Sequence, residues 1–139
     1  MMTKLKKVNL TDCIFCKIAG NQVPASVRFE DAEMVAFDDI NPHAPIHVLV
    51  VPKKHIPSLV DVSKTDEKLL GKLLYRCKLL AEELNIASSG YRVTINTGKW
   101  GGQIVPHLHL HLLGGAPLTE RLSIYTAAEA TLNRVKKFD

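Results

Sequence analysis

The segment 107–111 restricts the fold of this chain most strongly, because histidine and leucine alternate through all of its positions. Successive side chains of an extended strand point to opposite faces, so the alternation predicts a β-strand with three imidazoles on one face. The two leucines then lie on the other face, where a core can cover them. Three of the six histidines are thus expected on one small surface. Core packing does not require such a surface, and we interpret it as a functional site.

Two kinds of chemistry fit this surface. Imidazole serves near neutral pH as a metal ligand, a nucleophile or a proton carrier. Three imidazoles can bind one transition metal and leave a position open for water. Alternatively, one imidazole attacks an electrophile while its neighbours manage charge and protons. The segment by itself leaves both interpretations open.

Composition narrows the class of protein. At 139 residues the chain has the length of one domain, and its 46% of hydrophobic residues is ordinary for a soluble globular protein. The net charge of +4 suits an anionic substrate such as a nucleotide. There is no basic stripe with interleaved aromatic residues, so a nucleic-acid partner is not expected. No apolar run approaches the ~20 residues of a membrane span, so a membrane partner is not expected either.

The N-terminus and the cysteines predict the compartment. Residues 1–10 contain no long apolar stretch, so the sequence does not predict a secretory signal there. The chain has three cysteines, and an odd count in a chain that is not secreted indicates reduced thiols. We therefore expect a cytoplasmic protein.

Periodicity and turn residues predict the elements of the first half. A short helix over 13–19 is ended by Gly20 and Asn21. Strands over 27–29 and 34–37 form a hairpin around a polar turn. A dense β-branched run over 46–51, ended by Pro52, predicts a buried strand.

The second half is expected to supply a long helix and two more strands. Ser63 and Asp66 form a capping box ahead of leucines that repeat at helical spacing over 69–84. Strands follow over 91–96 and 105–112, and Pro106 predicts an edge or a bend at the start of the latter because it has no N–H. A second capping box, Thr126 with Glu129, predicts a terminal helix. Together these elements indicate an α+β domain with an antiparallel sheet.

Several sequence blocks, taken in order, resemble the histidine triad (HIT) superfamily and, within it, the HINT-like branch of small purine-nucleotide hydrolases. The resemblance spans about residues 12–115. It rests on the blocks DCIFCKI (12–18), AFDDI (36–40), HVLVVPKKH (47–55), NTG (96–98), GGQ (101–103), HLHLH (107–111) and GG (114–115). It implies a HIT domain over 12–115. From the residues themselves we expect a flexible arm over 1–11 and a C-terminal extension over 116–139 that is helical.

The resemblance also implies a fold and a reaction. The fold is a five-stranded antiparallel sheet with one long and one short helix, and two such sheets join across a homodimer. His109 attacks the α-phosphate of a purine nucleoside phosphoramidate or a related nucleotide and carries the nucleotidyl group until water hydrolyses it. His111 holds a phosphate oxygen and His47 completes the histidine cluster. The bound moiety is AMP or GMP, and no organic cofactor is implied.

A further set of residues is implied in nucleotide binding. Asp39 matches the position that holds ribose hydroxyls, and a glycine at Gly102 lets backbone N–H groups approach phosphate. Three further contacts are expected from the segments that precede the triad (Asn96, Gln103, Val105). Five apolar residues are expected to clamp the purine (Ile14, Phe15, Ile18, Phe37, Ile40). Ile14, Phe15 and Phe37 fit a plain core role equally well.

The chain departs from the family pattern at Ile104, where the family usually has Ser or Thr. That hydroxyl is thought to assist the leaving group, and isoleucine cannot donate a hydrogen bond. Removal of one preorganised donor costs ~10²–10³ in rate in other enzymes. The departure motivates an alternative function, a nucleotide-binding interaction or sensing module with weakened catalysis.

The pair Cys13-x-x-Cys16 points to a structural zinc ion, because Zn²⁺ prefers four N or S ligands in a closed site. By the resemblance, the other two ligands are His55 and His107. Two unligated buried thiols are the open alternative, and a redox pair is less favoured because no thioredoxin-like pattern follows. Cys77 falls on the apolar stripe of the long helix and is expected in the core.

Overall fold

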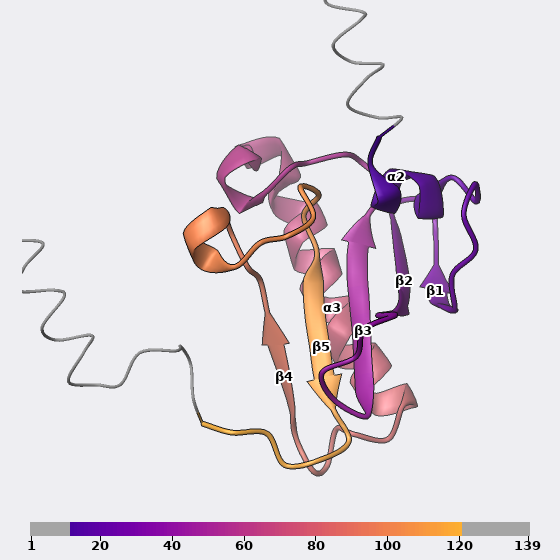
Figure 1. The fold of residues 1–139 in the computed structure, drawn as a ribbon, viewed down its shortest axis with the longest axis vertical. Coiled ribbons are helices and arrows are strands. Elements are labelled where there is room, and N and C mark those ends of the chain that lie inside the picture. The colour runs from indigo at the N-terminus through magenta and orange to yellow at the C-terminus, as the bar shows by residue number, and fades with distance from the viewer. Residues whose placement is uncertain (1–11, 121–139) are drawn as a thin grey trace, which may run out of the picture.

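Five strands form one antiparallel sheet in the order β1-β2-β3-β5-β4. The structure, a computed structural model, describes residues 12–120, and Figure 1 shows the sheet with the long helix α3 behind it. The predicted arm over 1–11 and the predicted helix around Thr126 and Glu129 lie outside the described residues. The strands are β1 (Val27–Glu30), β2 (Met34–Asp38), β3 (Ile46–Pro52), β4 (Tyr91–Thr94) and β5 (Leu110–Gly114).

Two α-helices accompany the sheet in the described part of the chain. The short helix α2 spans Ile14–Ala19 and the long helix α3 spans Glu67–Glu83. Short 3₁₀ turns occupy Leu59–Asp61, Lys64–Asp66 and Lys99–Gly101. The expected α+β class, with five antiparallel strands, one long helix and one short helix, is confirmed. None of the described helices has the length and apolar character needed to cross a membrane.

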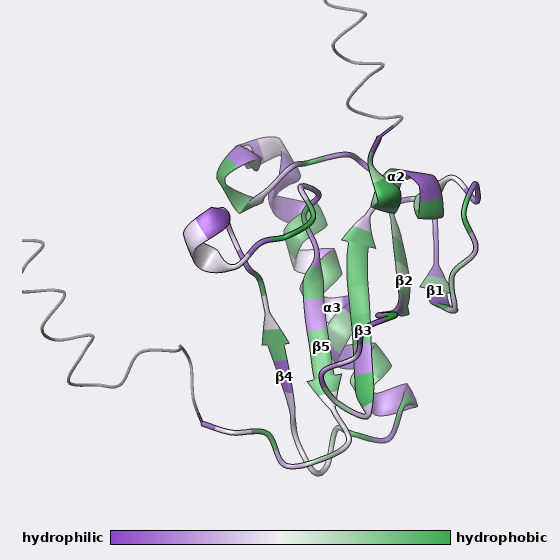
Figure 2. Cartoon of the chain, viewed as in Figure 1, coloured by the Kyte–Doolittle hydropathy of each residue, from purple (hydrophilic) through white to green (hydrophobic). Residues whose placement is uncertain are grey.

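The sheet is covered on both faces at its centre, which explains the dense apolar run of β3. Its residues Val48 and Val50 pack with α3, whereas Leu49 and Val51 pack with α2 on the opposite face. Figure 2 accordingly shows β2 and β3 mostly in the hydrophobic colour. The leucines of the triad segment face α3 together with the buried stripe of that helix (Leu73, Cys77, Leu80 and Ala81). The expected core position of Cys77 is thus confirmed.

The predicted strand over 105–112 is wrong at both ends, because β5 begins at Leu110 and ends at Gly114. Pro106 supplies no N–H for a ladder, and the backbone before Leu110 bonds elsewhere. The amide of Leu108 donates to the carbonyl of Ile56 at 2.6 Å, and that of His107 donates to Val105 at 2.8 Å. The strand predicted over 91–96 similarly ends at Thr94.

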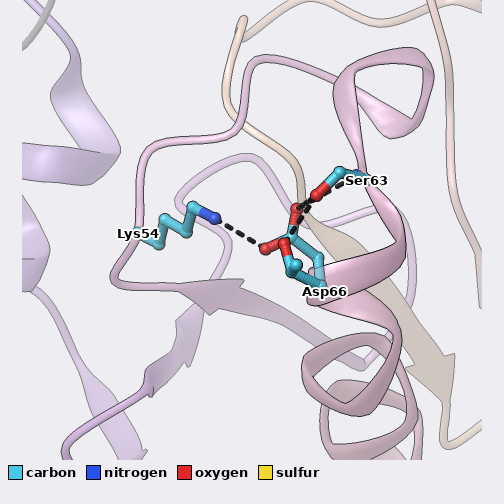
Figure 3. A network of polar contacts seen from close by, with 4 residues as sticks. Lys54, Ser63 and Asp66 are labelled. Atoms are coloured by element: carbon cyan, nitrogen blue, oxygen red, sulfur yellow. Dashed lines mark hydrogen bonds and ion pairs between the residues drawn. The ribbon is translucent and has the colours of Figure 1, made fainter.

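The start of α3 is anchored to the loop that follows β3. As Figure 3 shows, Lys54 and Ser63 converge on the carboxylate of Asp66. The Nζ atom of Lys54 lies 2.7 Å from Oδ1 of Asp66, and the amide of Ser63 donates to Oδ2 at 3.1 Å. The predicted contact between Ser63 and Asp66 is therefore present, although it closes a 3₁₀ turn and the α-helix begins one residue later. Lys54, which takes part in this network, directly precedes His55 in the chain.

Candidate active site

A cavity of about 580 Å³ lies on the face of the sheet opposite α3. Its floor includes Leu49 and Leu113, whose chain neighbours Val48 and Leu112 point the other way, into the core. Four histidines line it. His43 belongs to the loop before β3, and the other three are His47 from β3, His111 from β5, and His109, which stands just before β5. We call these three the cavity histidines. His47 and His111 lie on paired central strands, whereas His109 lies one residue before β5.

Hydrogen bonds determine which nitrogen of each cavity histidine carries the proton. The amide of His43 donates to Nδ1 of His47 at 3.0 Å, so His47 carries its own proton on Nε2. That Nε2 lies 2.9 Å from Nδ1 of His111 and donates to it. His111 therefore carries its proton on Nε2, where it is available to a ligand. Oδ2 of Asp39 lies 3.4 Å from Nε2 of His47 and adds electrostatic support to the same N–H group.

His109 has the opposite tautomer. Its Nδ1 lies 2.7 Å from the carbonyl oxygen of His107, and a carbonyl only accepts, so Nδ1 carries the proton. The Nε2 atom of His109 is then left with a free lone pair. The ring itself is buried and packs edge-on against Phe15 at a centroid distance of 5.1 Å. This arrangement presents an oriented nucleophilic nitrogen.

Burial keeps two of the cavity histidines neutral at pH 7. It lowers the pKa of His111 to about 4, and the neighbouring rings of His109 and His47 act in the same direction. Burial also lowers the pKa of His47, although the carboxylate of Asp39 opposes the shift. Neutral rings can keep the N–H···N bond between His47 and His111, which double protonation would break.

The apolar residues expected to clamp a purine all line the cavity. Ile14, Phe15 and Ile18 come from α2, and Phe37 and Ile40 come from the end of β2 and the loop after it. Phe15 and Phe37 are also buried and pack edge-on with their ring centroids 5.5 Å apart. The core role and the lining role therefore apply together to these two rings. Ile40, by contrast, is 91% exposed.

Asp39 also lines the cavity, beside the apolar wall. Its Oδ1 accepts from the amide of Asn41 at 2.9 Å, and Oδ2 faces His47. These contacts hold the carboxylate near the cavity histidines. Asp38 is paired instead with Arg28 through two hydrogen bonds of 2.9 Å.

Of the polar contacts predicted before the triad segment, some line the cavity and one does not. Gly102 and Asn96 line the cavity, and Gly102 has φ +83°, a conformation that glycine adopts without strain. Gln103 does not line it. The side-chain oxygen of Gln103 accepts from the amide of Gly98, and its nitrogen donates to the carbonyls of Pro57 and Val105. Gln103 is therefore a brace that shapes this loop.

Ile104 and Val105 complete the wall next to this loop, and the side chain of Ile104 is 92% exposed. The sequence interpretation missed His43, whose backbone amide determines the tautomer of His47. The available signal was its position four residues before His47. The contact uses a backbone amide, however, so the residue type at position 43 does not reveal it. Other lining residues that were missed are mostly apolar or small (Val23, Pro24, Ala25, Leu49, Thr94 and Leu113), and two are polar (Asp38 and Asn41).

The four residues expected to bind zinc meet in one place, away from the cavity lining. The ligand atoms of Cys13, Cys16, His55 and His107 all lie within 4.8 Å of one another, and we call this group the Cys₂His₂ site. Nδ1 of His107 lies 3.3 Å from Sγ of Cys13. Nδ1 of His55 lies 3.2 Å from Sγ of Cys16.

The protonation of this group fits a metal ion. Nε2 of His107 donates to the carbonyl of Pro52 at 2.8 Å, so its Nδ1 is unprotonated and free to coordinate. Burial, together with Cys13, raises the pKa of the Cys16 thiol to about 12. A bound cation would stabilise the Cys16 thiolate here, and two cysteines with two imidazoles match the preference of Zn²⁺.

A second group of possible ligands does not fit in the same way. Asp39, His47 and His111 also bring three ligand atoms within 4.8 Å. However, Nε2 of His47 carries a proton because the amide of His43 occupies Nδ1, so this nitrogen has no lone pair for a metal. The group is a chain of N–H donors and acceptors. A single metal held by all three triad histidines is also excluded by geometry, since both ring nitrogens of His107 are engaged elsewhere.

These features have a match among known protein families. The sequence model described as "HIT domain" matches residues 20–118 of this chain. The chain belongs to the HIT family. The expected resemblance is therefore confirmed, and the HIT fold accounts for the order of strands seen here.

Known HIT proteins resemble this chain over most of its length. The purine nucleoside phosphoramidase of Escherichia coli K12 is 42% identical over 112 residues, which are 81% of this chain and 94% of that protein. The solved HIT family hydrolase from Legionella pneumophila is 47% identical, with a TM-score of 0.79. The match covers 81% of this chain and 100% of the Legionella chain. A zinc-bound histidine triad protein from Mycobacterium smegmatis is 28% identical, with a TM-score of 0.68, and covers 93% and 99% of the two chains.

Proposed function

We propose that this HIT protein hydrolyses purine nucleoside phosphoramidates or related nucleotides through a covalent nucleotidyl intermediate on His109. The hydrogen bond of 2.7 Å from Nδ1 of His109 to the carbonyl of His107 carries this proposal, because it leaves Nε2 as an unprotonated nucleophile. The phosphoramidase from Escherichia coli, at 42% identity, supports the substrate class.

The order of residues across the cavity supports a placement for the nucleotide. The purine, of an AMP or GMP moiety, lies against the apolar wall of Ile14, Phe15 and Ile18. Asp39, beside that wall, accepts hydrogen bonds from ribose hydroxyls. The α-phosphate then reaches the cavity histidines on the central strands, and the leaving group faces the loop that contains Gly102 and Ile104.

The reaction proceeds in two displacements. The Nε2 lone pair of His109 forms a bond to the α-phosphorus while the bond from phosphorus to the leaving nitrogen breaks, and that nitrogen takes a proton from water. The Nε2–H of His111 donates to a phosphoryl oxygen and stabilises its developing charge. Water then attacks phosphorus and gives up a proton that neutralises the hydroxide left by the first step, the bond to His109 breaks with its electrons returning to Nε2, and AMP leaves. Nδ1 of His109 keeps its proton throughout.

Ile104 favours a second candidate function. Its exposed side chain lines the part of the cavity that faces the leaving group and offers no hydrogen-bond donor. A chain with the same nucleotide pocket but slow departure of the leaving group acts as a nucleotide-binding or sensing module. The rate of phosphoramidate turnover separates the two functions.

We also propose that the Cys₂His₂ site holds a structural zinc ion. The ligand geometry supports this proposal, as does the zinc-bound relative from Mycobacterium smegmatis. The ion would supply a closed four-ligand crosslink between α2, the loop after β3 and the triad segment. It takes no part in the chemistry at phosphorus.

A cytoplasmic homodimer is proposed as the working form of the protein. The edge strand β4 exposes Tyr91, and α3 exposes Leu74 and Tyr75, which supports a partner on that side. All three cysteines are free, which suits a reducing compartment. Within each subunit we propose a HIT domain over 12–115 and a helical extension over 116–139.

The proposed function is tested by incubating the full chain with adenosine 5′-phosphoramidate and measuring AMP release. We expect turnover by the wild-type chain, and an adenylylated protein in acid-quenched samples analysed by mass spectrometry. His109→Ala should lose both signals and still bind AMP within a few-fold of wild type by calorimetry. Near-native turnover in His109→Ala would reject the covalent mechanism. AMP binding without any wild-type turnover would favour the sensing module.

A further inference from the structure

His107 takes part in two sites through two parts of its structure. Its ring nitrogen Nδ1 lies 3.3 Å from Sγ of Cys13 and 3.1 Å from Nδ1 of His55, inside the Cys₂His₂ site. Its backbone carbonyl accepts the hydrogen bond of 2.7 Å from Nδ1 of His109. One residue thus contributes a metal ligand and also the acceptor that keeps the nucleophile in its reactive tautomer.

The carbonyl of His107 is not held by the sheet. Pairing between β3 and β5 begins at Leu110, so no ladder hydrogen bond positions the backbone at His107. The adjacent amide of Leu108 donates instead to the carbonyl of Ile56, at 2.6 Å. Ile56 directly follows His55, which belongs to the Cys₂His₂ site. The position of this carbonyl therefore depends on how that site holds the two histidines.

The helix α2 forms a second connection between the sites. Cys13 is its N-cap and Cys16 lies in its first turn, so Phe15 stands between two ligand residues. The ring of Phe15 lies edge-on to His107 at 5.9 Å and to His109 at 5.1 Å, and it lines the cavity. Phe15 therefore packs against a residue of each site and is itself part of the cavity wall.

We propose that the Cys₂His₂ site and the nucleotide cavity are energetically coupled, with His107 as the positioning residue for His109. A cation bound by the four ligands holds the carbonyl of His107 and the ring of Phe15 where the bound nucleotide requires them. This inference rests on the proposed nucleotide-binding function. Coupling is reciprocal, so the cation and the nucleotide raise each other's affinity by one common factor, for which about 5-fold or more is expected.

Calorimetry on the full chain tests this coupling with AMP as the probe. AMP is titrated into the zinc-loaded protein and into the same protein after chelation and dialysis, with folding verified by circular dichroism. We expect the Kd for AMP to rise about 5-fold or more on metal removal, and the Kd for Zn²⁺, measured against a competing chelator, to fall by the same factor when AMP is saturating. Equal AMP affinity in the loaded protein and the folded metal-free protein would overturn the proposal.

Matched cysteine variants show whether the coupling depends on the site. Cys16→Ala removes one ligand and should abolish the zinc dependence of AMP binding. Cys77→Ala removes a buried thiol of α3 that is outside the Cys₂His₂ site, and it should keep that dependence. Loss of coupling in both variants, or its persistence in both, would contradict the role of the site.

A spectroscopic measurement avoids the metal-free state. In the Cd²⁺-loaded chain, the cadmium resonance is expected to shift when AMP binds, and this shift should be smaller in His109→Ala, which keeps only the connection through Phe15. Nitrogen NMR of the imidazoles should show His109 protonated on Nδ1 in the loaded chain. A cadmium resonance that does not move while calorimetry shows bound AMP would overturn the coupling. Failure of AMP to bind any form of the chain would instead reject the nucleotide-binding function.

Discussion

Nε2 of His47 lies 2.9 Å from Nδ1 of His111, across the neighbouring strands β3 and β5. The proton of this bond belongs to His47, because the amide of His43 donates to its other ring nitrogen. A backbone N–H therefore determines, through one ring, the tautomer of a second ring. At His109 the backbone partner is an acceptor instead of a donor, and this carbonyl keeps the proton on Nδ1. The cavity thus contains one ring nitrogen oriented as a donor and one that keeps a free lone pair.

The first prediction concerns this chain of hydrogen bonds. His47→Ala frees His111 to take either tautomer and should lower kcat for adenosine 5′-phosphoramidate by about 10²-fold, the lower end of the range for acid–base groups. KM should change much less. His43→Ala is the matched control, since it keeps the backbone amide and should retain near-native kcat. An equal loss in both variants would show that the ring of His43, rather than its amide, is required.

The second prediction concerns the dependence of stability on pH. Burial lowers the pKa of His111 in the folded chain to about 4, whereas an exposed histidine titrates near 6.5. The unfolded chain binds this proton first as the pH falls. The stability that this residue contributes is therefore complete above about pH 6.5 and is lost progressively down to about pH 4.

Thermal unfolding at several pH values checks that stability decreases as the pH falls. Compared with wild type, His111→Gln should show a smaller decrease in Tm between about pH 7 and pH 5. Asp66→Asn is a suitable control, because the Asp66 carboxyl titrates below this window. A wild-type Tm that rises on acidification would contradict the direction of the pKa shift.

The third prediction concerns the leaving group. Ile104→Ser restores a hydroxyl beside the cavity and should raise turnover of adenosine 5′-phosphoramidate, by up to about 10²-fold if one donor is the limiting loss. The Kd for AMP should stay within a few-fold of wild type. Ile40→Ser is the matched control, because this isoleucine is also exposed and lines the same cavity next to Asp39. A similar increase in both variants would point to general loosening of the cavity.

The fourth prediction concerns the anchor between Lys54 and Asp66. The Lys54 ammonium, together with the amide and hydroxyl of Ser63, lowers the pKa of the Asp66 carboxyl. The stability from this carboxylate is present above its unfolded pKa of about 3.9 and is lost as the pH falls through the lower folded value. Asp66→Asn should therefore lower Tm at neutral pH. Asp38→Asn, which breaks the exposed ion pair with Arg28, should lower it less, and the reverse order would reject the anchor.

Local patterns in the sequence determined much of this protein. Strict alternation over 107–111 correctly separated the leucines, which reach the core, from the histidines on the other face. The spacing Cys13-x-x-Cys16 and the repeat of leucines in α3 were informative for the same reason. Side-chain direction along a strand or a helix follows from backbone period alone, and the residue types that bury or ligate can be read from neighbours in the chain.

Periodicity placed the three triad histidines on one face, and only the family resemblance separated His107 from the other two. The tertiary structure provides the physical basis for that separation. His107 turns to Cys13 and His55, which are 94 and 52 residues away along the chain, whereas His109 and His111 face the cavity. Gln103 became a brace and His43 a backbone donor for the same kind of reason. The tautomer of an imidazole depends on which donor or acceptor meets each nitrogen, and these partners come from segments that only folding brings together.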